Sequence, residues 1–144
     1  MASRRAWMRA ASLLLVGGLA TTGVHAQDPR ATAANAAARG WLALVDRDDV
    51  AGSYKAAGAK FRKALSEKDW LAATVKERKP RGAVAARALF QTALNAKVPE
   101  TYGPGEYALL GFRTSFGKQV DARETVTLER ESDGVWRVIG YFVR

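Results

Sequence analysis

The carboxylate with the clearest chemical context in this sequence is Glu124. Val126 and Leu128 alternate with polar residues after it, so a strand here would place Glu124 on an apolar face. A carboxylate that points into a core needs a partner, and the candidates are Arg87 and Arg113. The sharper alternative is a catalytic carboxylate in a pocket. Because no second carboxylate stands at a matching position, the pattern favours a structural salt bridge.

Two residue types that carry much of enzyme chemistry are almost missing. The 144 residues include no cysteine and a single histidine, His25. A cysteine nucleophile, a thiolate metal site and a disulfide scaffold are therefore excluded. His25 precedes the cleavage site predicted below, so the mature chain also lacks the histidine of acid–base catalysis, of Ser-His-Asp triads and of most metal sites. Since there is no glycine-rich phosphate loop either, we expect a protein that is not an enzyme and takes no cofactor or metal.

The first 26 residues have the three parts of a secretory signal peptide. A positive start is followed by an apolar run at 10–20 and by small residues at both specificity positions of a V-H-A site. Cleavage is expected between Ala26 and Gln27. This divides the chain into a signal peptide, 1–26, and one domain, 27–144, with a periplasmic or secreted location.

Residues 1–26 have two alternative interpretations, a membrane-spanning helix and a twin-arginine export signal. A membrane-spanning helix needs roughly 20 apolar residues, and the run between Arg9 and Thr21 is too short for one. We therefore expect no membrane span. The segment Ser3–Arg9 also resembles a twin-arginine export motif, so the general secretory and twin-arginine routes both stay open, with the first favoured.

A set of aromatic residues is spaced so that it could line a pocket between helices and a curved sheet, a common ligand location. With the two polar groups that would accompany it, the candidate pocket consists of Trp41, Tyr54, Phe61, Trp70, Arg87, Phe112, Glu124 and Trp136. The alternative is that the aromatic residues are ordinary core. A domain of ~120 residues needs such side chains for its core, so this second interpretation is favoured.

Positive charge is concentrated in the middle of the chain. Residues 55–87 hold ten Lys and Arg against three Asp and Glu, whereas the mature chain as a whole has a net charge of +6. The candidate contacts with an anionic surface are Lys55, Lys60, Arg62 and Lys63. Their partner would be an anionic envelope component or an acidic protein, with nucleic acid disfavoured for an exported protein. A solvated helical face is the alternative, and the pattern favours it.

The elements that must position these residues are helices followed by strands. The Asp28-Pro29 pair is a typical helix start, and Ser66 with Asp69 resembles a capping box. Helical spacing predicts three short helices over 29–79 and a further turn at 61–65. The period then changes to two in 106–116, 123–131 and 135–143, which predicts antiparallel strands and an α+β fold.

The patterns of two segments, 83–94 and 135–143, each allow two interpretations. Residues 83–94 fit a helix by alanine content, but Val84, Ala86, Ala88, Phe90, Thr92 and Leu94 also alternate as in a strand. Residues 135–143 are apolar on both faces, with Trp136, Val138 and Phe142 opposite Val135, Ile139 and Tyr141. This last strand is therefore expected to lie centrally or under a helix.

Several of these residues also match a known family in spacing. The most specific are Glu124-Thr125-Val126 and the ending D-G-x-W-R-V-x-G-Y over 133–141, accompanied by Trp41-Leu42, Phe61, Trp70, 78–82, Arg87, 105–107 and Phe112. Over most of the mature chain the sequence resembles an exported bacterial family catalogued as domain of unknown function 4019. The charges of Lys79 and Arg81 depart from its pattern.

The resemblance implies a nuclear-transport-factor-2-like or cystatin-like fold, with about three N-terminal helices packed on a curved four-stranded antiparallel sheet. It also implies that 83–94 is the first strand. For function, the residues favour an exported, non-catalytic binding or interaction module. The alternatives are a small-molecule carrier and a cofactor-free isomerase or hydrolase that uses a pocket carboxylate.

Overall fold

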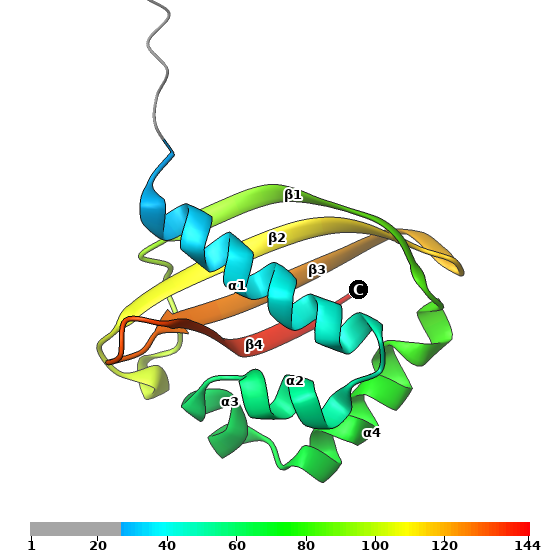
Figure 1. Cartoon of the computed structure of the whole chain (residues 1–144), viewed down its shortest axis with the longest axis horizontal. Helices are drawn as coiled ribbons and strands as arrows, with labels where there is room; N and C mark the ends of the chain where they lie inside the picture. Colours follow the sequence, from blue (N-terminus) through cyan, green and yellow to red (C-terminus); the bar gives the residue numbers. More distant parts are fainter. Residues whose placement is uncertain (1–26) are drawn as a thin grey trace, which may run out of the picture.

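The computed structural model describes residues 27–144 and confirms the α+β class. The predicted signal peptide, 1–26, lies outside the described residues. Figure 1 shows the helices gathered on a four-stranded antiparallel sheet. In chain order the elements are α1 (Pro29–Asp46), α2 (Val50–Ala56), α3 (Ala59–Ala64), α4 (Glu67–Glu77), η1 (Lys79–Arg81), β1 (Val84–Leu94), η2 (Glu100–Tyr102), β2 (Glu106–Phe116), β3 (Gln119–Arg130) and β4 (Trp136–Val143).

Polar caps set where the helices begin. The Asp28 side chain accepts from the backbone N–H of Arg30, and Pro29 occupies the first helical position. Ser66 Oγ accepts from the backbone N–H of Asp69 at 3.1 Å, which confirms the predicted cap of α4. Most of the predicted turn at 61–65 belongs to a short helix, α3, so within residues 27–144 four α-helices precede the sheet.

Residues 83–94 form a strand, as the resemblance implied. β1 pairs with β2, and the sheet order is β1-β2-β3-β4. The predicted faces of β1 were wrong, because register shifts lie between Val84 and Ala86 and between Leu89 and Gln91. Each bulge changes the side to which the following residues point. Leu89 therefore packs against the core, while Phe90 is exposed.

A bulge also explains why β4 is apolar on both faces. Thr127 pairs with Gly140 but Leu128 pairs with Val138, so Ile139 is the extra residue. Val138 and Tyr141 consequently pack on the same core, which corrects the prediction that they face opposite ways. β4 is an edge strand that lies under a helix, since the N–H of Gly58, before α3, donates to the carbonyl of Val138 at 2.7 Å.

Glycine is needed at position 58 for this close approach. A Cβ there would lie 2.9 Å from the Ile139 side chain and 3.3 Å from the Val138 carbonyl oxygen. The contact seals the free edge of the sheet near the helices, which is one way in which proteins protect exposed strands.

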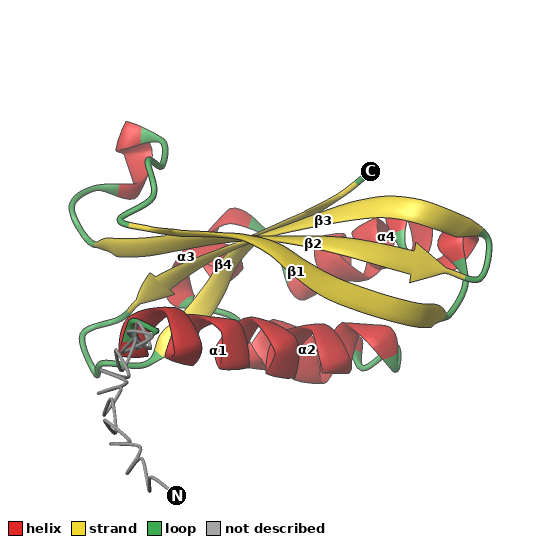
Figure 2. Ribbon diagram, turned by 90° about the horizontal axis from the view of Figure 1, so that it is seen from above, coloured by secondary structure: helices red, strands yellow, loops and turns green. Residues whose placement is uncertain are grey.

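The core fills the space between the helices and one face of the sheet. In Figure 2, α1 and α2 lie on the same side of the strands. The buried core residues are Ala34, Ala38, Trp41, Leu42, Val45, Ala57, Phe61, Trp70, Ala108, Leu110, Phe112, Val126, Leu128, Trp136 and Val138. The opposite face of the sheet carries exposed side chains, among them Phe90 and Phe142. Among the helices of the described part, none has the length and apolar character of a membrane span.

Candidate functional site

Glu124 is fully buried and accepts four hydrogen bonds. Arg87 Nε donates to Oε1 at 2.8 Å, and Arg78 Nη1 donates to Oε2 at 3.4 Å. The hydroxyls of Thr114 and Tyr141 donate to Oε1 and Oε2 respectively. The predicted salt bridge between Glu124 and Arg87 is therefore confirmed. The other candidate partner, Arg113, points away from Glu124 and lies over the ring of Phe90.

A second carboxylate completes the arrangement. Asp46, the last residue of α1, accepts from Arg87 Nη1 at 2.7 Å and Nη2 at 2.9 Å, and from Arg78 Nη2 at 2.7 Å. Two arginines thus bridge two carboxylates, and the formal charges cancel. We call this set the Glu124 network, and it consists of Asp46, Arg78, Arg87, Thr114, Glu124 and Tyr141.

The pKa values of the network fit fixed protonation states. Burial raises the pKa of Asp46, but hydrogen bonds from Arg87 and Arg78 outweigh burial and hold it below the ordinary value. Burial raises the pKa of Tyr141 strongly, and the charge of Glu124 raises it further, so this phenol stays protonated. Burial lowers the pKa of Arg87, yet its bonds to Asp46 and Glu124 leave it raised overall.

This geometry is that of a clamp between elements. The network joins the end of α1, the end of α4 and all four strands, and each oxygen of Glu124 already accepts from two donors. A general base needs a free lone pair directed at its substrate. Over residues 27–144, moreover, no group of three or more His, Cys, Asp or Glu is placed to hold a metal ion.

Arg78, Thr114 and Tyr141 were not identified from the sequence as partners of Glu124, nor was Asp46 as the second carboxylate. Arg78 counted there only toward the charge of the basic stretch 55–87. Tyr141 was predicted to lie on the face opposite Val138, because the bulge at Ile139 leaves no mark in the alternation. No local signal identifies these partners, since up to 63 residues separate Arg78 from the side chains that it contacts.

Next to the network, a cleft of about 320 Å³ lies between α4 and β4. Its lining residues are Trp70, Ala73, Thr74, Glu77, Arg78, Arg81, Tyr141, Phe142, Val143 and Arg144. Two buried donors at this cleft, Arg78 Nε and Arg81 Nε, have no hydrogen-bond partner among the described residues. Elsewhere on its guanidinium, Arg81 donates to the Glu77 carbonyl and lies 3.7 Å from the Glu77 carboxylate.

The predicted aromatic pocket does not form as one cavity, because most of its members are core residues. Trp41, Phe61 and Trp70 pack on one another with ring centroids 5.2–5.9 Å apart. Ser53 satisfies both indoles, since Trp41 donates to its carbonyl and Trp70 to its hydroxyl, each at 2.9 Å. Phe112 and Trp136 are buried as well. Of the predicted aromatic set, Trp70 alone also lines the cleft.

Tyr54 and the predicted anionic-surface residues lie around α2 and α3. Tyr54 donates its hydroxyl to the Leu65 carbonyl at 2.8 Å. Lys60 Nζ contacts both carboxylate oxygens of Glu129 at 2.7 and 2.8 Å, so its charge is already paired. Arg62 is exposed but donates to the carbonyls of Ala57 and Lys55, whereas the side chains of Lys55 and Lys63 face solvent.

In the folded structure, fewer positive charges of residues 55–87 are unpaired than the sequence of this stretch indicates. Lys60 pairs with Glu129, and Arg78 and Arg87 pair with Asp46 and Glu124. All three of these acids lie outside the stretch. Counting charges within a window of sequence therefore overstated the free positive charge.

Comparison with known proteins gives one match. The model of a family described as "Protein of unknown function (DUF4019)" matches residues 37–141. No curated protein and no solved structure matches the chain. The matched range includes all six residues of the Glu124 network and most of the residues that line the cleft.

Proposed function

The chain belongs to the DUF4019 family of proteins of unknown function, and from that premise we propose that it is an exported, non-catalytic binding domain. Its ligand site is the cleft between α4 and β4. The observation that carries this proposal is the pair of buried Nε–H donors of Arg78 and Arg81, which lack acceptors among the described residues and lie beside an apolar wall.

The state of Glu124 supports a role without catalysis. Glu124 is the carboxylate that the alternative of an isomerase or hydrolase would use, and two arginines and two hydroxyls occupy its oxygens. A substrate would have to displace one of these donors before Glu124 could accept a proton. Because an unpaired buried charge is costly, such displacement is unfavourable.

The cleft itself defines the chemistry of the ligand. Its volume is at the lower end of the range for small-molecule sites, and Trp70, Ala73, Tyr141 and Val143 contribute apolar surface. A buried N–H without an acceptor costs roughly 1–3 kcal/mol. Protein atoms cover both Nε atoms, so a ligand oxygen recovers this energy only when the two arginine side chains turn toward the cleft. We therefore assign to the cleft a small, mainly apolar ligand that ends in a carboxylate or carbonyl group.

A pair of neighbouring alanines on α4 provides a matched test. Ala73 lines the cleft, whereas Ala72 is exposed and does not. With octanoate as the probe, chemical shifts in the NMR spectrum should report binding to the wild type and to Ala72→Phe. Ala73→Phe fills the cleft and should abolish the shifts. Binding that survives Ala73→Phe, or no binding of octanoate to the wild type, would contradict the proposal.

One observation favours a second function, adhesion to an anionic component of the envelope. Lys55 and Lys63 are exposed, and within the described structure neither has an acidic partner. Binding of this kind weakens steeply as salt is added, because exposed charges are screened within ~8 Å at physiological ionic strength. Vesicles that contain phosphatidylglycerol should therefore retain the wild type at low salt but not the Lys55→Glu/Lys63→Glu variant. Equal retention of both proteins would exclude this surface.

A further inference from the structure

The sheet face opposite the helices carries two arginines directly across from each other. Arg113 of β2 and Arg123 of β3 are register partners, and both are exposed. Like charges at such positions destabilise a sheet. Neither guanidinium has an ion pair or a hydrogen bond within residues 27–144, although Arg87, Arg130 and Arg137, the other arginines of the four strands, all have acidic partners.

An aromatic ring holds this arginine pair in place. The guanidinium carbons of Arg113 and Arg123 lie 5.6 and 5.5 Å from the centroid of Phe90. The register shift between Val84 and Ala86 puts Leu89 on the core side, so the next residue, Phe90, points to this face. Gly111 makes room for its ring. A Cβ at position 111 would come within 2.8 Å of the Phe90 ring. Cation–π attraction thus offsets part of the repulsion between the two charges.

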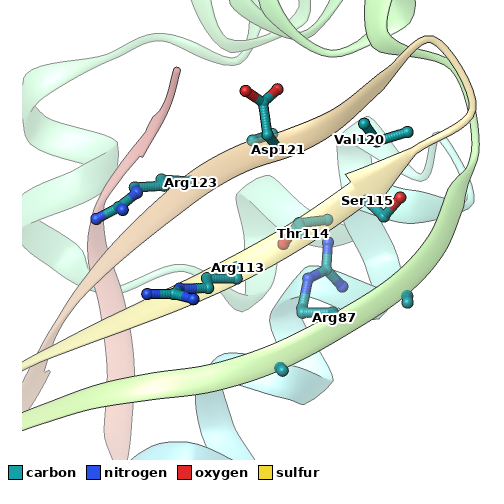
Figure 3. Close-up of a pocket in the computed structure, with 10 residues that line it drawn as sticks. Arg87, Arg113, Thr114, Ser115, Val120, Asp121 and Arg123 are labelled. Carbon is teal, nitrogen blue, oxygen red and sulfur yellow. The ribbon is translucent and has the colours of Figure 1, made fainter.

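A hollow of about 480 Å³ adjoins the pair. Figure 3 shows Arg113 and Arg123 extending in the same direction from neighbouring strands. Small side chains such as those of Ala86, Ala88 and Ser115 leave the space beside them. This volume suits a small molecule and not an extended surface.

One carboxylate, that of Asp121, lies near the arginine pair and could neutralise part of its charge. Asp121 also lines the hollow, two residues before Arg123 on the same strand. Its side chain points away from both guanidinium groups in Figure 3, and it forms no ion pair with them. Two positive charges on one small area of sheet are therefore left without local neutralisation by the described residues.

We propose that Arg113, Arg123 and the hollow beside them bind the phosphate monoester group of a soluble small molecule. A monoester carries a charge of about −1.5 to −2 at pH 7, which matches two guanidinium groups. Its three terminal oxygens can accept from both arginines at once, whereas a single carboxylate is matched by one. The site lies on the face opposite the cleft of the proposed function and does not depend on it.

Phenyl phosphate is a suitable probe, with benzoate as the singly charged control. Titration calorimetry should detect binding of phenyl phosphate, and benzoate should bind at least about tenfold more weakly. Arg113→Gln and Arg123→Gln should each weaken phenyl phosphate binding by about tenfold or more. Arg130→Gln, which replaces an exposed arginine of β3 that has an acidic partner, is the matched control and should leave binding unchanged.

Stability distinguishes a binding role from a structural one. Removal of one of two opposed charges should leave the thermal midpoint unchanged or raise it, so a clear fall in both glutamine variants would overturn the proposal. Unchanged phenyl phosphate affinity in these variants, or equal affinity for benzoate, would also overturn it.

Vesicles containing phosphatidic acid test whether the phosphate monoester belongs to a lipid headgroup instead of a soluble molecule. If the protein binds these vesicles but does not bind phenyl phosphate, the proposal that the ligand is soluble is contradicted. Ala73→Phe should not affect this site, so the two proposals fail separately.

Discussion

At the scale of single residues, the charged side chains with the most contacts form a charge-balanced group, of which Arg78 and Glu124 are buried. Arg78 is 7% exposed and Glu124 is 0% exposed, and each makes contacts with several elements. Charged groups at such depth are tolerated only when they are paired and hydrogen-bonded. The stability of the fold should therefore depend strongly on each member of the Glu124 network.

Replacing Glu124 tests this dependence. Glu124→Gln removes the negative charge but keeps the size of the side chain, and it leaves Arg78 and Arg87 with one carboxylate between them. Breaking a buried pair in this way costs about 3–5 kcal/mol of unfolding free energy. Urea denaturation followed by circular dichroism would measure the loss.

Glu106→Gln is the matched control for this measurement. Glu106 also contacts two arginines, Arg30 and Arg130, but at 3.5 and 3.3 Å and with 31% of its side chain exposed. Surface pairs of this kind contribute about 0–1 kcal/mol. Similar losses in the two variants would show that the Glu124 network is no more important than a surface pair.

The pH dependence of stability should report on Asp46. Its pKa in the folded protein lies below the ordinary value of 3.8, so its contribution is fully present above that value and is lost as the pH falls through the folded pKa. The unfolding free energy should therefore decrease on acidification below about pH 4. Asp46→Asn should be less stable than the wild type at neutral pH, and the difference should shrink in acid. A constant difference across this range would contradict the assignment.

At the scale of elements, bulges decide which side chains meet. The extra residue at Ile139 turns Tyr141 toward Glu124, and the register shift between Val84 and Ala86 places Phe90 on the face of the arginine pair. Both candidate sites of the sheet thus depend on a local break in its alternation. Helix ends also bring distant side chains together. The end of α1 places Asp46 beside Arg78, which follows α4, and beside Arg87 of β1.

The contact between α3 and β3 gives a test at this scale. Hydrogen bonding to Glu129 raises the pKa of Lys60, so this lysine ties α3 to the sheet. Lys60→Glu would place two carboxylates together and should lower the thermal midpoint. Lys63→Glu, three residues later on the same helix and exposed, should leave the midpoint nearly unchanged. Equal midpoints for both variants would show that the Lys60–Glu129 pair does not contribute to stability.

At the scale of the whole molecule, the helices bury one sheet face and leave the other with exposed groups. The cleft lies at the edge where α4 meets β4, and the arginine pair lies on the uncovered face of β2 and β3. A domain with two such surfaces can hold one small ligand at each. This arrangement supports a binding function without requiring a catalytic centre.

Export is the remaining prediction for the whole molecule. If residues 1–26 are a cleaved signal peptide, the protein recovered from its native host should begin at Gln27 and carry a net charge of +6. Mass spectrometry of the intact protein would measure this start directly. A mature protein that retains Arg4, Arg5 and Arg9 would contradict cleavage.

The sequence by itself determined the class of the fold, because helix caps and hydrophobic periods are local properties of the chain. Ser66 and Asp69 indicate the start of α4, and the alternation of Leu110 and Phe112 indicates β2. Residue types alone also excluded cysteine-based sites, and because His25 is the only histidine they made histidine-based sites in the mature chain unexpected. That Glu124 pairs with an arginine could also be predicted, since a buried carboxylate needs a cation, and Arg87 was one of two candidates.

Only the tertiary structure decided which other groups surround that carboxylate and which faces remain free. A bulge shifts every later side chain by one face and leaves no mark in composition or periodicity. Tyr141 was therefore predicted on the face opposite Val138, and Phe90 on the same face as Val84, and both groupings were wrong. Asp46 reaches Arg78 and Arg87 across 32 and 41 residues, so their charges cancel in space although the basic stretch looks unpaired along the chain. Long-range pairing of this kind depends on how the elements pack, and packing is the property that a single sequence shows least directly.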